Sequence, residues 1–223
     1  MKTLKRAFAF ILTLALALTS ITGIAFAEVD YSQWDSQSAY PSDVVNTPLF
    51  APVKFLIDKK VLTGYPDGTF KPANPITRAE VAVAITKMTN RTNNLVEMEK
   101  ITVFSDLAGY DWAKGYINTL AKENVIKGMT ATTYAPAKNI SYAEFITLLI
   151  RSKGGAASEI ENTGTWPNNY IQYAQMYNLL GDVVVTDWNA DATRGDVAKL
   201  MYRIMPKSTT TSALSVNTYG ALY

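Results

Sequence analysis

The sequence of 223 residues contains no cysteine and no histidine. Without cysteine there can be no disulfide crosslink, no thiolate metal site, no cysteine nucleophile and no lipid-modified N-terminal cysteine. Without histidine, the commonest general base and the commonest transition-metal ligand are missing, which excludes most hydrolase triads and most zinc chemistry. We therefore expect a protein that is not an enzyme and that needs no metal or cofactor.

Residues 1–27 have the pattern of a cleaved export signal. An apolar run, Ala7 to Leu18, follows three basic residues and precedes the small-x-small site Ala25-Phe26-Ala27. A membrane anchor is the alternative, but hydroxyl residues interrupt the apolar stretch, which then runs into the processing site. We expect cleavage after Ala27 and an exported mature chain with no transmembrane anchor, in which a packed core replaces crosslinks.

The formal net charge of +2 comes from this segment. It holds three of the 21 basic residues and none of the 19 acidic ones, so the mature chain carries a charge of −1. A near-neutral chain has no electrostatic footprint for nucleic acid. Binding of an anionic ligand would have to depend on a few well-placed cations.

One five-residue phrase occurs three times. It reads Ile-Thr-Arg-Ala-Glu at 76–80, Ile-Ser-Tyr-Ala-Glu at 140–144 and Ala-Thr-Arg-Gly-Asp at 192–196. Around each copy, apolar residues recur at helical spacing on both sides of a turn. Such a repeat indicates a helix–loop–helix unit that buries its apolar face only by packing against its copies.

The repeats divide the chain into five parts. They are a signal peptide at 1–27, unit 1 with a lead-in at 28–90, unit 2 with a linker at 91–153, a divergent unit 3 with a linker at 154–206, and a Ser/Thr-rich tail at 207–223. The polar stretches 90–98 and 154–165 are predicted to be linkers. We expect an all-α fold of three tandem helix–loop–helix repeats packed around a common axis.

Two features are predicted for the helices of each unit. The helices that start near Thr77, Ser141 and Thr193 are the most evenly apolar and should form the shared core. The first helix of each unit should end at a glycine cap: Gly64, Gly128 and Gly181.

The hydroxyl and acid positions of the phrase predict helix caps. In a capping box the hydroxyl accepts a hydrogen bond from the amide three residues on, and the carboxylate there reaches back to the cap amide. The three pairs are Thr77 with Glu80, Ser141 with Glu144, and Thr193 with Asp196. These residues need no ligand to account for them.

Arg78 and Arg194 are not accounted for by capping. A cation in the first helical turn is mildly unfavourable against the helix dipole. Beside free helix amides, a guanidinium would complete a small site for a carboxylate. Ligand binding is therefore the main hypothesis for both arginines, and a solvated surface position is the alternative. Tyr142 stands at this position in unit 2 and keeps a hydroxyl and a ring face, with the same two alternatives.

Other candidate binding residues surround the phrase. The loop from Tyr65 to Phe70 predicts a tight turn that ends with Phe70 in the core, and its Asp67 and Gly68, with Lys71, could line a groove beside Arg78. Trp112 and Trp166 open the first helices of units 2 and 3. Core packing is the first interpretation of these tryptophans, and stacking on a sugar is the second.

The chain resembles the S-layer homology (SLH) family. The resemblance is carried by Gly64 to Pro72 with Ile76 to Glu80 in unit 1, by Phe104-Ser105-Asp106 with Trp112 and Ile140 to Glu144 in unit 2, and by a vestige at Tyr40 to Asp43. It implies a pseudo-threefold all-α module on the bacterial cell surface or in the S-layer, which binds a pyruvylated secondary cell-wall polysaccharide and so attaches to the peptidoglycan-containing wall.

The resemblance also assigns roles to particular residues. Arg78 and Arg194 match the arginine with which the family contacts an anion, and Asp67 and Gly68 match its groove loop. Tyr142, and Gly195-Asp196 in place of Ala-Glu, depart from the family pattern. Three similar surface grooves are expected between adjacent units, and we therefore expect one or two of them, rather than all three, to bind the polysaccharide.

Two other functions stay open. A wall-associated adaptor or S-layer component would bind another protein, and exposed apolar patches outside the grooves would favour it. A carboxylate-pair glycosidase would need two acids about 5–10 Å apart in a cleft, and the repeated acids are already explained as caps.

Overall fold

The computed structural model describes residues 39–154 and 157–207. These residues form helices and loops without a β-strand, so the predicted all-α class is confirmed. The helices are α2 (Phe50–Asp58), α3 (Arg78–Met88), α4 (Leu95–Glu99), α5 (Asp111–Lys122), α6 (Tyr142–Ser152), α7 (Ala157–Glu161), α8 (Asn168–Met176) and α9 (Arg194–Ile204). None of them is long and apolar enough to cross a membrane. The predicted signal peptide and the tail from residue 208 lie outside the described residues.

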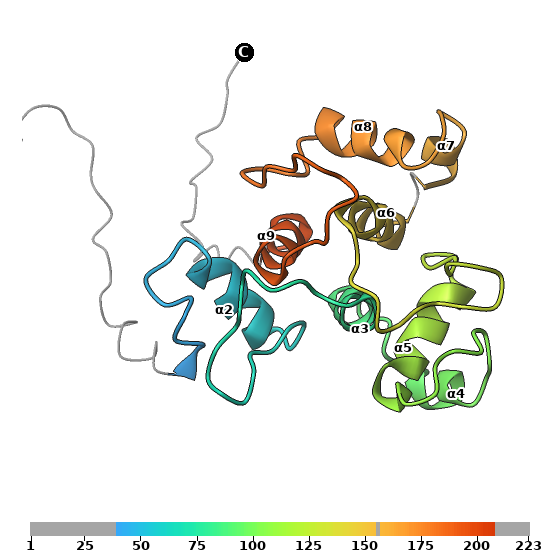
Figure 1. The fold of residues 1–223 in the computed structure, drawn as a ribbon, viewed down its shortest axis with the longest axis horizontal. Helices are drawn as coiled ribbons and strands as arrows, with labels where there is room; N and C mark the ends of the chain where they lie inside the picture. The colour runs from blue at the N-terminus through green and yellow to red at the C-terminus, as the bar shows by residue number, and fades with distance from the viewer. Residues whose placement is uncertain (1–38, 155–156, 208–223) are drawn as a thin grey trace, which may run out of the picture. The chain divides into compact units, whose positions relative to one another are not determined.

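Helices α3, α6 and α9 form the centre of the fold, where Figure 1 shows them nearly end-on. Eight of the eleven residues of α3 and nine of the eleven residues of α6 are buried. On α9 the buried side chains include Val197, Leu200 and Met201. The predicted assignment of these helices to the shared core is therefore confirmed.

The outer helices pack against a central helix of a neighbouring unit. Helix α5 packs on α3, α8 packs on α6, and α2 packs on α9 (Figure 1). The third contact joins the first helix of the described chain to its last helix. Each packed pair thus combines helices of two different predicted units, so each unit buries apolar surface against its neighbours.

The loops that lead into the central helices are bonded in a closed ring. The amide of Ile140 donates to the carbonyl of Ile76 (3.0 Å), Ala192 donates to Ile140 (2.8 Å), and Ile76 donates to Ala192 (3.2 Å). All three side chains are fully buried. Because each donor is also an acceptor, the ring satisfies buried backbone groups in all three units.

The glycine caps predicted for the outer helices are wrong. The left-handed residues that end α2, α5 and α8 are Lys60, Asn124 and Asn178, each three or four positions before the glycine. After α2, the amide of Val61 donates to Leu56, and that of Lys60 to Ile57. These are the two bonds of a Schellman motif, in which asparagine or even lysine can replace glycine at a modest cost in backbone energy.

The two segments predicted to be linkers contain short helices, α4 and α7. Helix α4 is held by Asn118 of α5, whose Nδ2 donates to the carbonyls of Met98 (2.8 Å) and Ile101 (3.0 Å). A buried side chain supplied by another helix can order a short polar segment whose own sequence favours a loop.

Candidate functional site

The capping boxes predicted for α3 and α6 are confirmed, and the third is incomplete. Thr77 and Ser141 each accept from the acid's amide, and each acid accepts in return from the cap amide. Thr193 accepts from the amide of Asp196 (3.1 Å), but Oδ2 of Asp196 bonds the hydroxyl of Thr193 (3.0 Å) instead of its amide. Aspartate is one methylene shorter than glutamate, which accounts for the difference.

The amides at the start of the central helices are not free, contrary to the predicted anion site. On α3 the amides of Arg78 and Ala79 donate to the carbonyls of Lys138 (2.9 Å) and Pro136 (3.2 Å), which belong to unit 2. The starts of α6 and α9 are bonded in the same way to the loops of units 3 and 1. Because the cap satisfies the next amide, a ligand cannot use these helix ends without displacing protein.

Arg78 and Arg194 are buried, with exposed fractions of 5% and 4%. The solvated-surface alternative is therefore wrong. The Nε of Arg78 donates to the carbonyl of Tyr134 (2.9 Å), its Nη1 pairs with Glu144 (3.3 Å), and its guanidinium stacks on the Tyr134 ring. In return the Tyr134 hydroxyl, whose pKa is raised by burial, donates to the carbonyl of Arg78 (2.8 Å). The arginine thus joins unit 1 to unit 2.

Arg194 makes the equivalent contacts between units 3 and 1, with two additions, a hydrogen bond to Thr63 and a contact with the Tyr65 ring. Its Nε donates to Phe70 (3.0 Å), its Nη1 to Glu80 (3.2 Å), and its Nη2 to the carbonyl of Thr63 (2.9 Å). Its guanidinium also contacts the rings of both Tyr65 and Phe70, with Cζ 4.7 Å from each ring centroid. All three guanidinium nitrogens of Arg194 are therefore occupied, whereas Nη2 of Arg78 has no hydrogen-bond partner among residues 39–154 and 157–207.

The loop with Asp67, Gly68 and Lys71 lies against Arg194 and not beside Arg78, as the contacts of Arg194 with Tyr65 and Phe70 show. Asp67 pairs with Lys71 (2.8 Å), and this hydrogen bond, with those from Thr69, lowers the pKa of Asp67 to about 2. Gly68 has a φ of 77°, which the turn requires. Phe70 is fully buried, as predicted.

Asp43 and Asp106 organise the loops of units 1 and 2, a role that the sequence analysis missed. The carboxylate of Asp106 accepts from the amides of Tyr134 (2.9 Å) and Ala135 (2.7 Å), and Asp43 accepts from Phe70 and Lys71 in the same way. Ala135 and Lys71 both have positive φ. Both acids lie in the Ser-Asp pairs that carry the family resemblance. The recurrence of this pair ahead of the loop in units 1 and 2 was the sequence signal that could have identified their role.

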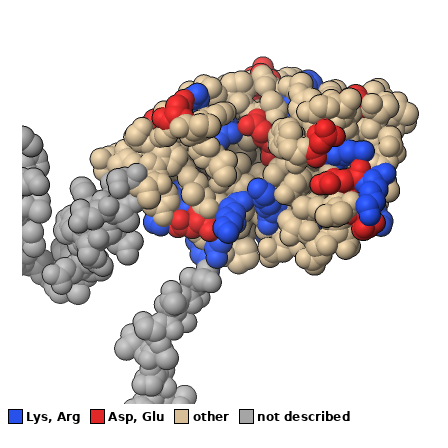
Figure 2. All heavy atoms as spheres, turned by 90° about the horizontal axis from the view of Figure 1, so that it is seen from below, with Lys and Arg blue, Asp and Glu red and all other residues tan. Residues whose placement is uncertain are grey.

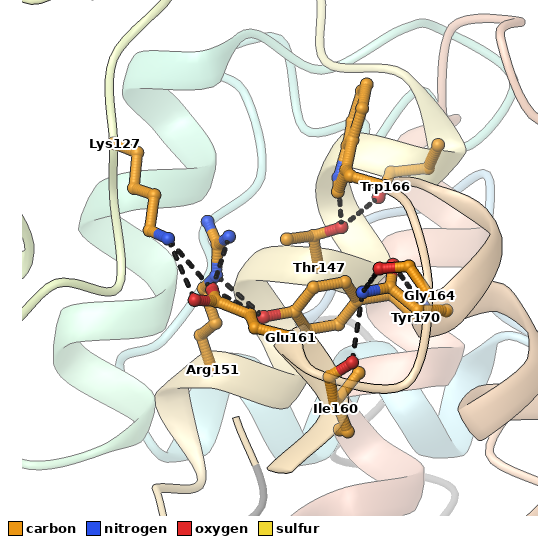
Figure 3. A network of polar contacts seen from close by, with 10 residues as sticks. Lys127, Thr147, Arg151, Ile160, Glu161, Gly164, Trp166 and Tyr170 are labelled. Atoms are coloured by element: carbon orange, nitrogen blue, oxygen red, sulfur yellow. Dashed lines mark hydrogen bonds and ion pairs between the residues drawn. The ribbon is translucent and has the colours of Figure 1, made fainter. Parts of the chain in front are cut away.

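A groove of about 440 Å³ runs along α6, and we call it the α6 groove. Its lining residues come from all three units: Arg78, Ile126, Lys127, Gly128, Met129, Glu144, Thr147, Leu148, Arg151 and Trp166. At one end, Lys127 and Arg151 point toward Glu161 of α7, and Trp166 lies over Thr147 (Figure 3). The groove therefore combines cations, one hydroxyl group and an aromatic ring.

Trp112 and Trp166 are each 53% exposed, so the core-packing interpretation of both is wrong. The indole Nε1 of Trp166 donates to Oγ1 of Thr147 (2.9 Å), which fixes the ring as a wall of the α6 groove. Trp112 lies near Tyr110, with ring centroids 6.2 Å apart. An immobilised, half-exposed indole beside polar groups is a suitable surface for the apolar face of a sugar ring.

Charges of both signs are interspersed on the face shown in Figure 2. The lining of the α6 groove contains three cations, Arg78, Lys127 and Arg151, and one carboxylate, that of Glu144. The described residues contain no group of three or more acidic side chains placed to hold a metal ion. The α6 groove is thus suited to a ligand with hydroxyl groups and a small number of negative charges.

Comparison with known proteins identifies two parts of the chain. Residues 42–82 and 103–146 match the model of the S-layer homology domain. These segments fall in units 1 and 2 and include Arg78, Tyr142 and both Ser-Asp pairs.

Three bacterial proteins with cell-wall, surface-layer and anchoring names are similar to the chain. It is 30% identical over 202 residues to the middle cell wall protein of Brevibacillus brevis. This alignment covers 89% of this chain and 18% of that protein. It is 28% identical over 178 residues to a surface layer protein of Brevibacillus choshinensis, an alignment that covers 80% of this chain and 15% of that protein. It is 34% identical over 127 residues to a cellulosome-anchoring protein of Acetivibrio thermocellus, with 54% of this chain and 28% of that protein covered. The chain therefore spans less than a third of the length of each of these relatives.

Proposed function

The chain carries S-layer homology domains, and from this premise we propose that it is a non-enzymatic cell-surface anchor that binds a carboxylated cell-wall polysaccharide in the α6 groove. The cell-wall and anchoring roles named for its relatives support this location and role. The carboxylate in question is the pyruvyl ketal of a secondary cell-wall polymer, which would tether the protein to the peptidoglycan-containing wall.

The observation that carries the proposal is the position of Arg78. Its guanidinium lines the α6 groove with Nη2 unoccupied among the described residues, while its other two nitrogens are held by Tyr134 and Glu144. A guanidinium fixed in this way can donate to a carboxylate with little loss of side-chain entropy. Trp166 lies across the same groove as a surface for the sugar ring.

The three equivalent positions, Arg78, Tyr142 and Arg194, differ in their capacity to bind a carboxylate under this proposal. Arg194 already donates from all three nitrogens, and Tyr142 donates its hydroxyl to Asp196, so neither offers the donor that Arg78 offers. Segment 154–206 is a third, divergent repeat, supported by the cap at Thr193 and by its place in the ring of backbone bonds. The ring also supports a pseudo-threefold arrangement of the three repeats.

The test is sedimentation of the mature protein with purified wall sacculi. The protein should sediment with sacculi that retain their polysaccharide and stay in solution once the polymer is extracted or lacks pyruvate. Replacing both arginines with alanine would disturb the fold, because both are buried. The sharper variant is Trp166→Ala, which should weaken binding about tenfold without changing helical content.

Trp112→Ala is the matched control, since Trp112 is equally exposed and occupies the same place in the neighbouring unit. It should leave binding within about twofold of the parent, a change close to what an exposed substitution produces. If Trp112→Ala weakens binding to sacculi and Trp166→Ala does not, the binding site does not lie in the α6 groove. Equal sedimentation with extracted sacculi would overturn polysaccharide binding itself.

Protein binding is the second candidate function. Met176 is 77% exposed and its neighbour Tyr177 is 59% exposed, at the end of α8 and outside the α6 groove. Exposed neighbouring apolar residues favour a protein contact. Replacing both with serine should reduce recruitment of a surface-protein partner to sacculi while the protein itself still sediments, whereas loss of its own sedimentation would argue against this role.

A further inference from the structure

Glu161 occupies the space between two cations of the α6 groove. Its carboxylate accepts from Nζ of Lys127 (2.9 and 3.0 Å) and from Nη2 of Arg151 (2.8 Å), as Figure 3 shows. The hydroxyl of Tyr170 donates to the same carboxylate (3.0 Å) and accepts from Nε of Arg151 (3.0 Å). The hydrogen bond from Lys127, with those from Tyr170 and Arg151, lowers the pKa of Glu161 to about 2.

This arrangement resembles a filled carboxylate site. Arg151 is held rigidly, because its side chain is 11% exposed and its guanidinium stacks on the Tyr170 ring. Lys127 is 53% exposed and could turn toward solvent or a ligand. The acid that satisfies both comes from α7, a helix of the linker between units 2 and 3, and not from the repeated part of the fold.

The charge of the groove depends on this acid. Arg78 pairs with Glu144, which Lys138 outside the groove lining also contacts, while Lys127 and Arg151 together face Glu161. The three lining cations therefore exceed these two acids by one positive charge. Without Glu161 the groove would hold two uncompensated cations and would attract any dense polyanion, including polyphosphate-like wall polymers, with little regard to its chemistry.

We propose that Glu161 determines the charge selectivity of the α6 groove, admitting a glycan with a single carboxylate and disfavouring polymers with several adjacent negative charges. The proposal rests on the function proposed above. Its physical basis is that specificity often comes from a repulsive element against the wrong ligand. A dense polyanion would meet the Glu161 carboxylate, whereas a single carboxylate can bind at Arg78.

The test compares Glu161→Gln with the parent. Glutamine keeps the size of the side chain and removes its charge. The probes are inorganic polyphosphate and a pyruvylated monosaccharide, each titrated at low and high salt. Glu161→Gln should bind polyphosphate about fivefold more tightly than the parent, with a steeper loss at high salt, as expected for unmasking a partly exposed cation. Its affinity for the pyruvylated sugar should change less.

Asp182→Asn is the matched control, because Asp182 forms an exposed ion pair with Lys199 (2.7 Å) outside the α6 groove. It changes the net charge equally and should leave polyphosphate binding near the parent value. A second variant, Lys127→Met combined with Glu161→Gln, restores the charge balance of the groove. It should return polyphosphate binding to the parent level, which a purely structural role of Glu161 would not produce.

Equal polyphosphate affinity in Glu161→Gln and Asp182→Asn would overturn the proposal, and so would a double variant that stays as tight as Glu161→Gln. Failure of the parent to bind the pyruvylated sugar is a separate result and would overturn the proposed function. If Glu161→Gln does not fold, the double variant is compared with the parent. The measured quantity is the ratio of the affinities for polyphosphate and for the pyruvylated sugar. A ratio that differs between the two proteins would contradict charge balance as the cause of the selectivity.

Discussion

The hydroxyl of Tyr142 donates to the carboxylate of Asp196 across 2.5 Å. Both residues are departures from the phrase of unit 1, which has arginine and glutamate at these positions, and they meet in space. The corresponding pairs are Arg78 with Glu144 and Arg194 with Glu80. The third residue of each phrase thus contacts the capping acid of another unit, and the change to tyrosine at 142 is matched by a change to aspartate at 196.

This pairing predicts strong coupling between Tyr142 and Asp196. In a double-mutant cycle with Tyr142→Phe and Asp196→Asn, the coupling energy should be about 1–2 kcal/mol, the range for a partly buried hydrogen bond to a charged group. Urea unfolding at neutral pH provides the measurement. Additive effects of the two substitutions would contradict the pairing.

Arg194 should contribute more to stability than Arg78. Arg194→Ala removes a buried cation and leaves Glu80 and two loop carbonyls without their partner, so the free energy of unfolding should fall by about 3 kcal/mol or more. Arg78→Ala should lower the free energy of unfolding by less, because Arg78 donates to only one loop carbonyl, that of Tyr134. Urea unfolding of both variants decides, and a larger loss for Arg78→Ala would contradict the contacts described for the two residues.

Removal of unit 3 should abolish cooperative folding. A chain that ends at residue 153 lacks α9, on which α2 packs, and lacks Arg194, which holds the loop of unit 1. Units 1 and 2 would retain their local caps but expose the apolar side of α2. Circular dichroism during thermal unfolding should show a broad transition in place of a sharp one. A sharp transition would mean that two units suffice.

Ala135→Gly should stabilise the fold. The φ of Ala135 is 56°, a region in which alanine is strained and glycine is not. We expect a gain of about 0.5 kcal/mol in the free energy of unfolding. Ala137→Gly is the control, because Ala137 is an exposed residue of the same loop without positive φ, and glycine there should only lower stability.

Acid should destabilise the protein between about pH 4.5 and pH 2. The pKa values of Asp67 and Glu161 are lowered to about 2, below the values of about 4 expected in the unfolded chain. The unfolded state therefore binds more protons as the pH falls, and the stability from these carboxylates, present at neutral pH, is lost. Urea unfolding at pH 7, 4, 3 and 2 measures the effect. Glu161→Gln should show a shallower acid loss than the parent, and an unchanged slope would contradict this.

Local spacing was sufficient to predict the central helices and their starts. A hydroxyl three residues before an acid and an apolar stripe at helical spacing act within one turn or one helix, and the structure has α3, α6 and α9 where these patterns place them. The ends of the outer helices were missed, because the Schellman bonds use Lys60 and Asn124 in left-handed conformations that composition does not reveal.

The roles of the arginines were decided by tertiary structure. The Nε of Arg194 bonds the carbonyl of Phe70, 124 residues away, and such a contact leaves no trace in local spacing. The sequence showed that the arginine is not needed for capping, and the fold shows that it is needed to join two units. Only the closed packing of α2 on α9 brings these groups together, because burial of each repeat's apolar face requires its neighbours.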